Sequence, residues 1–171
     1  MIVREAETHD ADAIAAIYAH HVLHGTASFD TEPPNTAYWQ SRIADTAERR
    51  WPFIVAQREN IVIGYAYATQ FRDRPAYVET CENSIYVAPD AVGSGVGTVL
   101  ITALVERAAL SGFRQMIAVI GGGESASVAL HTKAGFAHAG RMKDVGRKFG
   151  RLLDTVYMQR RLFDFAKGQD Q

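Results

Sequence analysis

The sequence predicts an α/β domain in which helices flank a mixed β-sheet. One observation is an antiparallel hairpin, with strands at residues 53–57 and 61–69 joined by the turn Arg58-Glu59-Asn60. The other is a strand at residues 79–87 that leads through a glycine-rich turn into a helix, followed by a further strand and helix. Antiparallel strands followed by strand–helix units predict one sheet with both kinds of strand pairing.

Caps, breakers and hydrophobic periodicity predict the remaining elements. Thr8 or Asp10 can cap a first helix that runs to about residue 23, where Gly25 stops it. Residues 26–35 and 71–77 read as loops, and the aromatic side chain and two prolines of the first loop suggest that it lines a site. Further strands are expected at residues 2–5, 116–120, 136–142 and 153–162, and further helices at 36–49, from the glycine-rich turn to Ser111-Gly112, and at 124–133.

Composition bounds the class of protein. The chain has 171 residues, of which 47% are apolar and 22% charged, as expected for one globular domain at residues 1–165 with a frayed tail at 166–171. A net charge of −1 gives no reason to expect a nucleic-acid partner, and no apolar run is long enough to span a membrane. The single cysteine, Cys81, excludes an internal disulfide framework and fits a reducing cytoplasm.

The glycine-rich turn, Gly93-Ser-Gly-Val-Gly97, is the strongest local signal. Alternating glycines where a strand turns into a helix let the backbone approach a ligand, and the free N–H groups of the helix start favour a phosphate or pyrophosphate. The turn lacks the Gly-Lys-Ser/Thr ending of a Walker loop and the G-x-G-x-x-G spacing of a dinucleotide fold. A glycine-rich turn without a ligand is the alternative.

The strand, Pro89-Asp90, the G-x-G-x-G turn and the helix together resemble the acetyl-CoA-binding core of the GNAT acetyltransferase superfamily. This resemblance implies a mostly antiparallel twisted sheet that is split at a parallel strand pair, with acetyl-CoA as co-substrate. Val92 stands where the superfamily usually has Gln or Arg, and Glu124 where it often has Asn. The residues implied in cofactor binding are Ile85, Tyr86, Val87, Val92, Gly93, Ser94, Gly95, Val96, Gly97, Thr98, Glu124 and Ser127.

Five further stretches resemble one branch of the superfamily, the phosphinothricin and methionine sulfoximine or sulfone N-acetyltransferases. They are TASFDTEP at 26–33, RPAY at 74–77, Glu82 within TCENSIYV, SVALH at 127–131 with Gly135-Phe136, and VGRKFGR at 145–151 with Asp154. The branch implies direct acetyl transfer to the α-amine of a small amino acid or analogue, by a homodimer. Substrate capture is expected from Phe29, Arg72, Arg74, Tyr77 and Lys148, since an arginine fork binds a carboxylate in bidentate fashion.

Two residues are candidates for catalysis. Acetyl transfer requires a neutral amine, and Glu82, an ionisable residue on the central strand, can take its proton. A salt bridge is the alternative for Glu82, and Glu79 is the substitute base, although its spacing turns it to the opposite face. His131 matches the position where the superfamily often has a tyrosine that protonates the leaving thiolate; a packed structural histidine is its alternative.

Other chemistries are disfavoured. Cys81 should point away from Glu82 and has no histidine near it in sequence, so covalent catalysis is rejected. The remaining histidines show no metal-ligand spacing, and no metal is assigned. Two rival functions stay open: acetylation of another amine, such as a polyamine or a protein N-terminus, and a CoA-binding sensor without catalysis. Arg72 and Arg74 argue against a polycation, and retention of Glu82 with His131 argues against a sensor.

Overall fold

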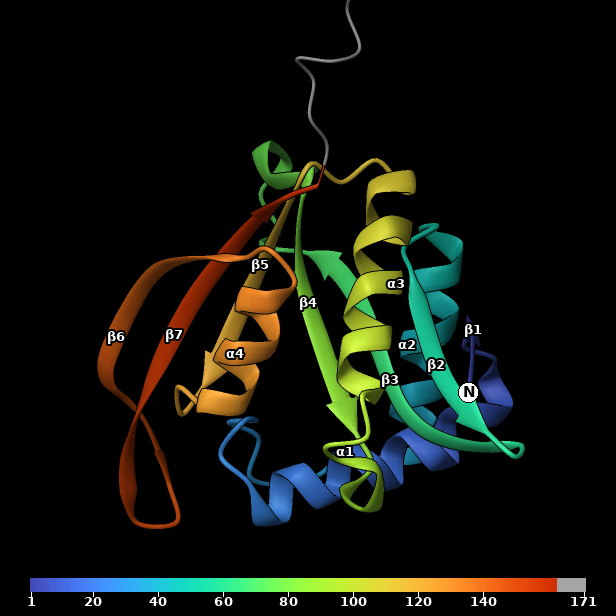
Figure 1. The fold of residues 1–171 in the computed structure, drawn as a ribbon, viewed down its shortest axis with the longest axis horizontal. Coiled ribbons are helices and arrows are strands. Elements are labelled where there is room, and N and C mark those ends of the chain that lie inside the picture. The colour runs from blue at the N-terminus through green and yellow to red at the C-terminus, as the bar shows by residue number, and fades with distance from the viewer. Residues whose placement is uncertain (163–171) are drawn as a thin grey trace, which may run out of the picture.

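A computed structural model describes residues 1–162, which form one seven-stranded sheet in the order β1-β2-β3-β4-β5-β7-β6 (Figure 1). Within it, β4 and β5 pair in parallel and every other neighbouring pair is antiparallel, as predicted. The strands are β1 Ile2–Glu5, β2 Phe53–Arg58, β3 Ile61–Gln70, β4 Thr80–Val87, β5 Gln115–Gly121, β6 Ala137–Lys148 and β7 Arg151–Arg161.

Helices cover both faces of this sheet. In Figure 1, α1 and α2 lie behind the strands and α3 and α4 lie in front of them. Their bounds are α1 Ala11–His24, α2 Thr36–Glu48, α3 Val96–Leu110 and α4 Ser125–Lys133, with short 3-10 turns at Thr8–Asp10, Pro75–Tyr77 and Pro89–Ala91. Two helix layers around a sheet allow the central strands to be buried on both sides.

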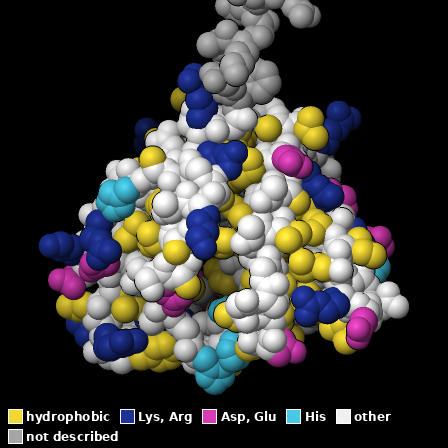
Figure 2. Space-filling model, in the orientation of Figure 1, with side chains coloured by type: hydrophobic (Ala, Val, Ile, Leu, Met, Phe, Trp, Pro, Cys, Tyr) yellow, Lys and Arg dark blue, Asp and Glu magenta, His cyan; other side chains and the backbone are white. Residues whose placement is uncertain are grey.

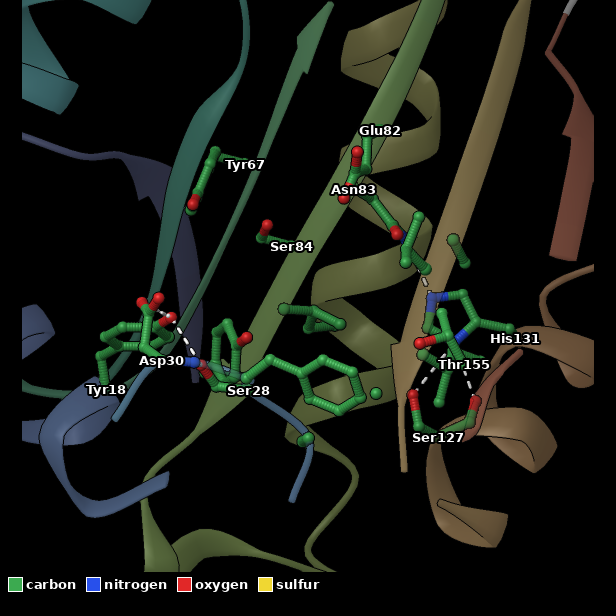
Figure 3. A pocket seen from close by; sticks show the side chains of 18 residues that line it. Tyr18, Ser28, Asp30, Tyr67, Glu82, Asn83, Ser84, Ser127, His131 and Thr155 are labelled. Carbon is green, nitrogen blue, oxygen red and sulfur yellow. Dashed lines mark hydrogen bonds between the residues drawn. The ribbon is translucent and has the colours of Figure 1, made fainter. Parts of the chain in front are cut away.

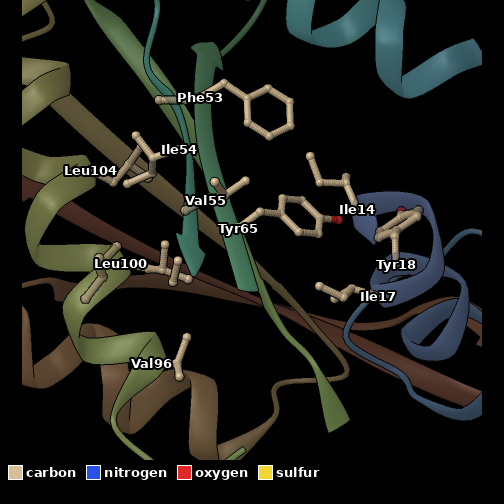
Figure 4. Packing of buried hydrophobic residues seen from close by; sticks show 14 of the residues in the cluster. Ile14, Ile17, Tyr18, Phe53, Ile54, Val55, Tyr65, Val96, Leu100 and Leu104 are labelled. Atoms are coloured by element: carbon tan, nitrogen blue, oxygen red, sulfur yellow. The ribbon is translucent and has the colours of Figure 1, made fainter. Parts of the chain in front are cut away.

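The alternation of side chains along β2 divides the core into two layers. Ile54 points to the α3 side, where it meets Leu100 and Leu104, while Phe53 and Val55 point to the α1 side (Figure 4). All of these side chains are buried, because successive residues of a strand face opposite surfaces and both surfaces are covered. The core therefore fixes α1 and α3 against the same strands from opposite sides.

The sheet opens between its two parallel strands. Pairing of β4 with β5 ends at Asn83 and Ala118. Beyond that point β4 continues to Val87 on β3 alone, and β5 continues to Gly121 on β7 alone. The last residues of β4 and β5 thus diverge on the side of the sheet where α3 begins. This opening is the split that the superfamily resemblance implied.

The bounds of the last hairpin, β6 and β7, differ most from those predicted. The strand predicted at residues 136–142 runs to Lys148, and its partner begins at Arg151 rather than residue 153. The prediction is wrong because Asp144, with φ 56°, lies in an irregularity between Met142 and Gly146 that interrupts the alternation without ending the strand. Phe149 and Gly150, with φ of 52° and 71°, form the tight two-residue turn, and phenylalanine is not a typical residue there.

Other predicted bounds agree with the structure or differ from it by one or two residues, as helix and strand ends commonly do, and β1 matches at both ends. Glu124 precedes α4 as its N-cap instead of beginning the helix, whereas α2 begins at Thr36 as predicted, with Asn35 as its N-cap. The frayed tail predicted at residues 166–171 lies outside the described residues. Among residues 1–162, no helix has the length and apolar content needed to cross a bilayer.

Candidate active site

Two cavities meet at the opening between β4 and β5. One, of about 440 Å³, lies beside the start of α3, and the other, of about 320 Å³, lies beside α1 and the loop at residues 26–35. They share four lining residues, Ala27, Ile85, Tyr86 and Ser127. A ligand in the first cavity can therefore reach a ligand in the second through the opening in the sheet.

The cavity beside α3, hereafter the cofactor cavity, is built around the glycine-rich turn. Gly93 and Gly95 have φ of 79° and 85°, which side chains rarely adopt, and a Cβ built on either would meet no atom within 4 Å. The glycines are therefore required by backbone conformation, and the space in front of them is open. The first N–H groups of α3 lack helical acceptors and present a positive dipole end, so this wall fits a phosphate-bearing cofactor.

Most residues predicted for the cofactor line this cavity, and two do not. Ser94 turns its hydroxyl back to the carbonyl of Ala91 at 2.7 Å, and the side chain of Val96 is buried in the core. Glu124 does line the cavity, but its carboxylate accepts a hydrogen bond from Thr26 Oγ1 at 3.0 Å. Those that line it are Ile85, Tyr86, Val87, Val92, Gly93, Gly95, Gly97, Thr98, Glu124 and Ser127.

His21 also lines this cavity, although it was not among the residues predicted for it. Its Nε2 lies 2.8 Å from the carbonyl oxygen of Val87, at the end of β4, and its ring packs on Tyr86. Since the carbonyl can only accept, Nε2 carries the proton. Figure 2 shows the surface hollowed between α4 and the start of α3, with hydrophobic side chains on its walls. Helix periodicity places His21 on the apolar face of α1, which by itself indicates a core position rather than a binding one.

The second cavity, hereafter the acceptor cavity, contains Glu82 (Figure 3). Its carboxylate lies 3.8 Å from Nη1 of Arg72, beyond hydrogen-bond distance, and the side chain is one-third exposed. Burial raises the pKa of Glu82 above its ordinary value, and the charge of Arg72 partly offsets that rise. A carboxylate with a raised pKa in a cavity is suited to accept a proton near neutral pH.

Glu79, the substitute base, and Cys81, the rejected nucleophile, both lie outside the acceptor cavity. Glu79 is exposed and paired with Arg114 at 2.9 Å, outside the acceptor cavity. Cys81 is fully buried, donates to the carbonyl of Gln115 and has its pKa raised to about 12 by burial. A thiol in that state is almost never ionised at neutral pH, so it is a poor nucleophile.

His131 borders the same cavity but has no free ring nitrogen. Its Nδ1 lies 2.8 Å from the carbonyl of Ser127, which can only accept, so Nδ1 carries the proton. Nε2 is then an acceptor, and the side-chain amide of Asn83 donates to it at 2.9 Å. Burial lowers the pKa of His131, so the ring is neutral. In this arrangement His131 presents no proton to the cavity.

The structure separates the residues predicted to capture the substrate. Phe29 lines the acceptor cavity, and Arg72 does not line it but approaches the carboxylate of Glu82 to 3.8 Å. Arg74 precedes the exposed 3-10 turn at Pro75–Tyr77, Tyr77 ends it, and neither lines the cavity. Lys148 is buried and donates from Nζ to the carbonyl of Ser28 at 2.8 Å. The sequence does not show that the turn at Pro75–Tyr77 is exposed, or that Lys148 holds the loop at residues 26–35 through the carbonyl of Ser28.

Several polar residues of the acceptor cavity were not predicted. Asp30, Tyr18 and Ser28 form a hydrogen-bonded group at one end, and Tyr67 and Ser84 lie between that group and Glu82 (Figure 3). Asp30 falls within the loop that was expected to line a site, which was the available signal. Tyr18 lies on the apolar face of α1, and periodicity alone indicates a core position for it. Among residues 1–162, no group of three or more His, Cys, Asp or Glu side chains could hold a metal ion.

A glycine-rich helix start on one side of a split sheet and a cavity with a carboxylate on the other are the features expected of an acetyl-CoA-dependent acetyltransferase. Residues 3–157 match the Acetyltransferase (GNAT) domain family, and the chain belongs to it. It is an N-acetyltransferase, with acetyl-CoA as its co-substrate.

Named relatives refine this comparison. The chain is 48% identical over 161 residues to a phosphinothricin N-acetyltransferase of Alcaligenes faecalis, covering 94% of this chain and 82% of that one. It is 38% identical to an L-methionine sulfoximine/L-methionine sulfone acetyltransferase of Pseudomonas aeruginosa, over 92% of each chain. A phosphinothricin acetyltransferase from Sinorhizobium meliloti, solved in complex with AcCoA, superposes with a TM-score of 0.91 at 45% identity, covering 94% of this chain and 87% of that chain.

Proposed function

We propose that this enzyme transfers the acetyl group of acetyl-CoA directly to the α-amine of a small amino acid or analogue, of the kind represented by phosphinothricin, methionine sulfoximine and methionine sulfone. The observation that carries the proposal is the position of Glu82, in a cavity of about 320 Å³ that opens onto the cofactor cavity. That volume suits a small molecule. The names of the relatives supply the acceptor class.

Glu82 acts as the general base. An amino acid reaches the site as an ammonium, which has no lone pair with which to attack the thioester. Glu82 removes the proton, directly or through water, and its raised pKa makes that transfer less unfavourable. The acetyl group then moves to the amine without a covalent enzyme intermediate, since the buried thiol of Cys81 does not reach the cavity.

His131 acts as a positioning residue while its two hydrogen bonds persist. Its Nε2 fixes the amide of Asn83, and its Nδ1–H ties the ring to the first turn of α4. Protonation of the leaving thiolate by His131 would require one of these bonds to break. The same bonds hold Ser127, which lines both cavities, at a fixed place beside β4.

Arg72 is the residue best placed to meet the carboxylate of the acceptor. It approaches Glu82, which lines the cavity, to 3.8 Å, and its guanidinium stacks over Phe71 with 4.1 Å between Cζ and the ring centroid. Phe29 forms the apolar wall. Arg74, Tyr77 and Lys148 contribute to substrate capture only if the exposed turn or the loop at residues 26–35 changes position on binding.

A polyamine is the second candidate acceptor. It is favoured by the charges of the acceptor cavity: Glu82 and Asp30 line it, and no Lys or Arg does so among the described residues. Release of CoA thiol with methionine sulfoximine, methionine sulfone, phosphinothricin, the common amino acids and spermidine, each followed by mass spectrometry of the product, decides between them. We expect N-acetylated amino acids or analogues and no turnover of spermidine. Turnover confined to spermidine would overturn the proposal.

We also propose that the enzyme is a homodimer and works in the cytoplasm. The long β6–β7 hairpin carries four exposed apolar side chains, Met142, Val145, Phe149 and Leu152, which a second copy could cover. The only cysteine is free and buried, as suits a reducing compartment. Sedimentation of the purified protein at about twice the mass of one chain is the expected result, and a concentration-independent monomer would contradict it.

A further inference from the structure

One end of the acceptor cavity is closed by a ring of three hydrogen bonds. Tyr18 donates its hydroxyl proton to Asp30 Oδ2 at 2.5 Å. The hydroxyl of Ser28 lies 2.7 Å from that of Tyr18, and the backbone N–H of Asp30 donates to Ser28 Oγ at 3.1 Å. Because the proton of Tyr18 is already given to Asp30, Ser28 must donate to Tyr18. Every polar proton of the three groups is thus used inside the ring.

The ring is held from two sides. Tyr18 belongs to α1, where it packs edge to face against Trp39 and Tyr86, at 5.2 and 5.0 Å between centroids. Burial and the bond to Asp30 raise the pKa of Tyr18 well above its ordinary value, so the phenol stays protonated and keeps donating. From behind, Lys148 donates to the carbonyl of Ser28 at 2.8 Å. The loop at 28–30 therefore presents Asp30 to the cavity in a defined position.

The result is an end wall whose free carboxylate oxygen only accepts hydrogen bonds. Asp30 carries the negative charge there; its side chain is solvent-exposed, and the ammonium of Lys148 is close enough to interact with that charge. Among the described residues, Oδ1 of Asp30 has no hydrogen-bond partner, and Asp30 lines the cavity at the end opposite His131 (Figure 3). A ligand group at this end binds more tightly if it carries an N–H that can donate to Oδ1 of Asp30. A group with only oxygen atoms meets repelling lone pairs, and an anionic group meets a like charge.

On these grounds we propose that Asp30, fixed by Tyr18 and Ser28, determines acceptor specificity by selecting an uncharged amino acid whose side chain ends in an N–H donor. The inference rests on the proposed function and adds a ranking within its substrate class. Methionine sulfoximine and methionine sulfone have nearly the same shape, but only the sulfoximine has an N–H where the sulfone has a second oxygen. Phosphinothricin ends in an anionic phosphinate. The order expected is sulfoximine, then sulfone, then phosphinothricin.

The test is kcat/KM for these three acceptors with wild type and with Asp30→Asn. The amide of Asn can still accept from Tyr18, so the variant should fold, which its thermal melting curve checks. In the wild type, sulfoximine should exceed sulfone by about tenfold or more, the scale of one hydrogen bond to a charged group. In Asp30→Asn the preference should shrink about tenfold, because the amide can also donate to the sulfone oxygen.

A matched control is Asp45→Asn, which removes an exposed carboxylate of α2 that pairs with Arg49 at 3.1 Å. It should leave the ratio of the two acceptors unchanged. If wild type and Asp30→Asn both acetylate sulfoximine and sulfone equally well, the inference is wrong while the proposed function stands. An equal loss for all acceptors in Asp30→Asn would place Asp30 on the shared α-amine and also overturn it. Failure of every amino acid, with turnover of spermidine, would instead reject the proposed function.

Discussion

The side-chain amide of Asn83 donates to Nε2 of His131 at 2.9 Å, which ties the strand that carries Glu82 to the helix that borders both cavities. The two residues are 48 positions apart in the sequence. The contact lies at the edge of the opening between β4 and β5, since Asn83 and Ala118 are the last paired residues of these strands. It keeps the imidazole neutral with its proton on Nδ1, because Asn83 offers Nε2 a donor and burial disfavours the charged ring.

Asn83→Asp should change His131 from a neutral ring to one that is more readily protonated on Nε2. A carboxylate in place of the amide has no proton to donate, and its charge favours an imidazolium with a proton on Nε2. The pKa of His131, lowered in the wild type, should rise by roughly one unit or more, the scale for an opposite charge in contact. Titration of the histidine ring protons by NMR, with His131→Gln to assign the resonance, measures this. An unchanged titration would show that Asn83 does not control the ring.

Arg72→Gln should move the acidic limb of the pH–rate profile to higher pH. Arg72 lowers the pKa of Glu82 by its charge, against the rise caused by burial. Without that charge the pKa rises further, so a higher pH is needed to generate the basic form. The shift should be about a few tenths of a unit to one unit, because the guanidinium is half exposed and 3.8 Å away. A limb that stays in place, with acceptor KM alone increased, would restrict Arg72 to substrate binding.

Gly95→Val should weaken acetyl-CoA binding through the glycine-rich turn. The substitution places a β-branched side chain at φ 85° and fills open space that the cofactor phosphates need. An increase in Kd of about ten- to hundredfold by calorimetry is expected, the scale of losing one or two hydrogen bonds to a charged group. Gly112→Val is the matched control, since Gly112 has φ 95° and open space but lies at the end of α3 away from both cavities. Equal affinities in the two variants would contradict a specific role for the turn.

Gly146→Ala should displace Phe29 from the acceptor cavity. A Cβ at Gly146 would lie 2.4 Å from Cε2 of Phe29, too close for any real contact. The half-exposed ring must move, so KM for the acceptor should increase on the order of tenfold, as overpacking of one contact commonly costs. Gly140→Ala on the same strand meets no atom within 4 Å and should behave as wild type. If Gly146→Ala keeps its acceptor KM, Phe29 does not form the wall of the site.

Local signals account for what the sequence predicted well. The strand, the glycine-rich turn and the helix after it are specified by neighbours in the chain, and Glu82 stood out because a charge on a buried strand is costly. The split sheet followed from resemblance to a family. Contacts between distant segments explain the rest: Lys148 turned inward to Ser28, 120 positions away, and Tyr18 met Asp30 across a loop that has no periodic pattern. Helix periodicity marks a residue as facing inward, but it does not distinguish a core tyrosine from one whose hydroxyl reaches a cavity.

Glu82→Gln distinguishes a general base from a structural carboxylate, because it keeps the size of the side chain and removes its basicity. Charged Glu82 costs stability at neutral pH, since its folded pKa lies above the unfolded value and the stabilising protonated form is lost as pH rises through it. The melting temperature at pH 7 should therefore stay equal or rise. On the same preparation kcat/KM should fall about 10²- to 10⁴-fold, the usual scale of general base catalysis. A lower melting temperature with near-normal turnover by the folded enzyme would show that Glu82 is not the general base and is instead a structural partner of Arg72.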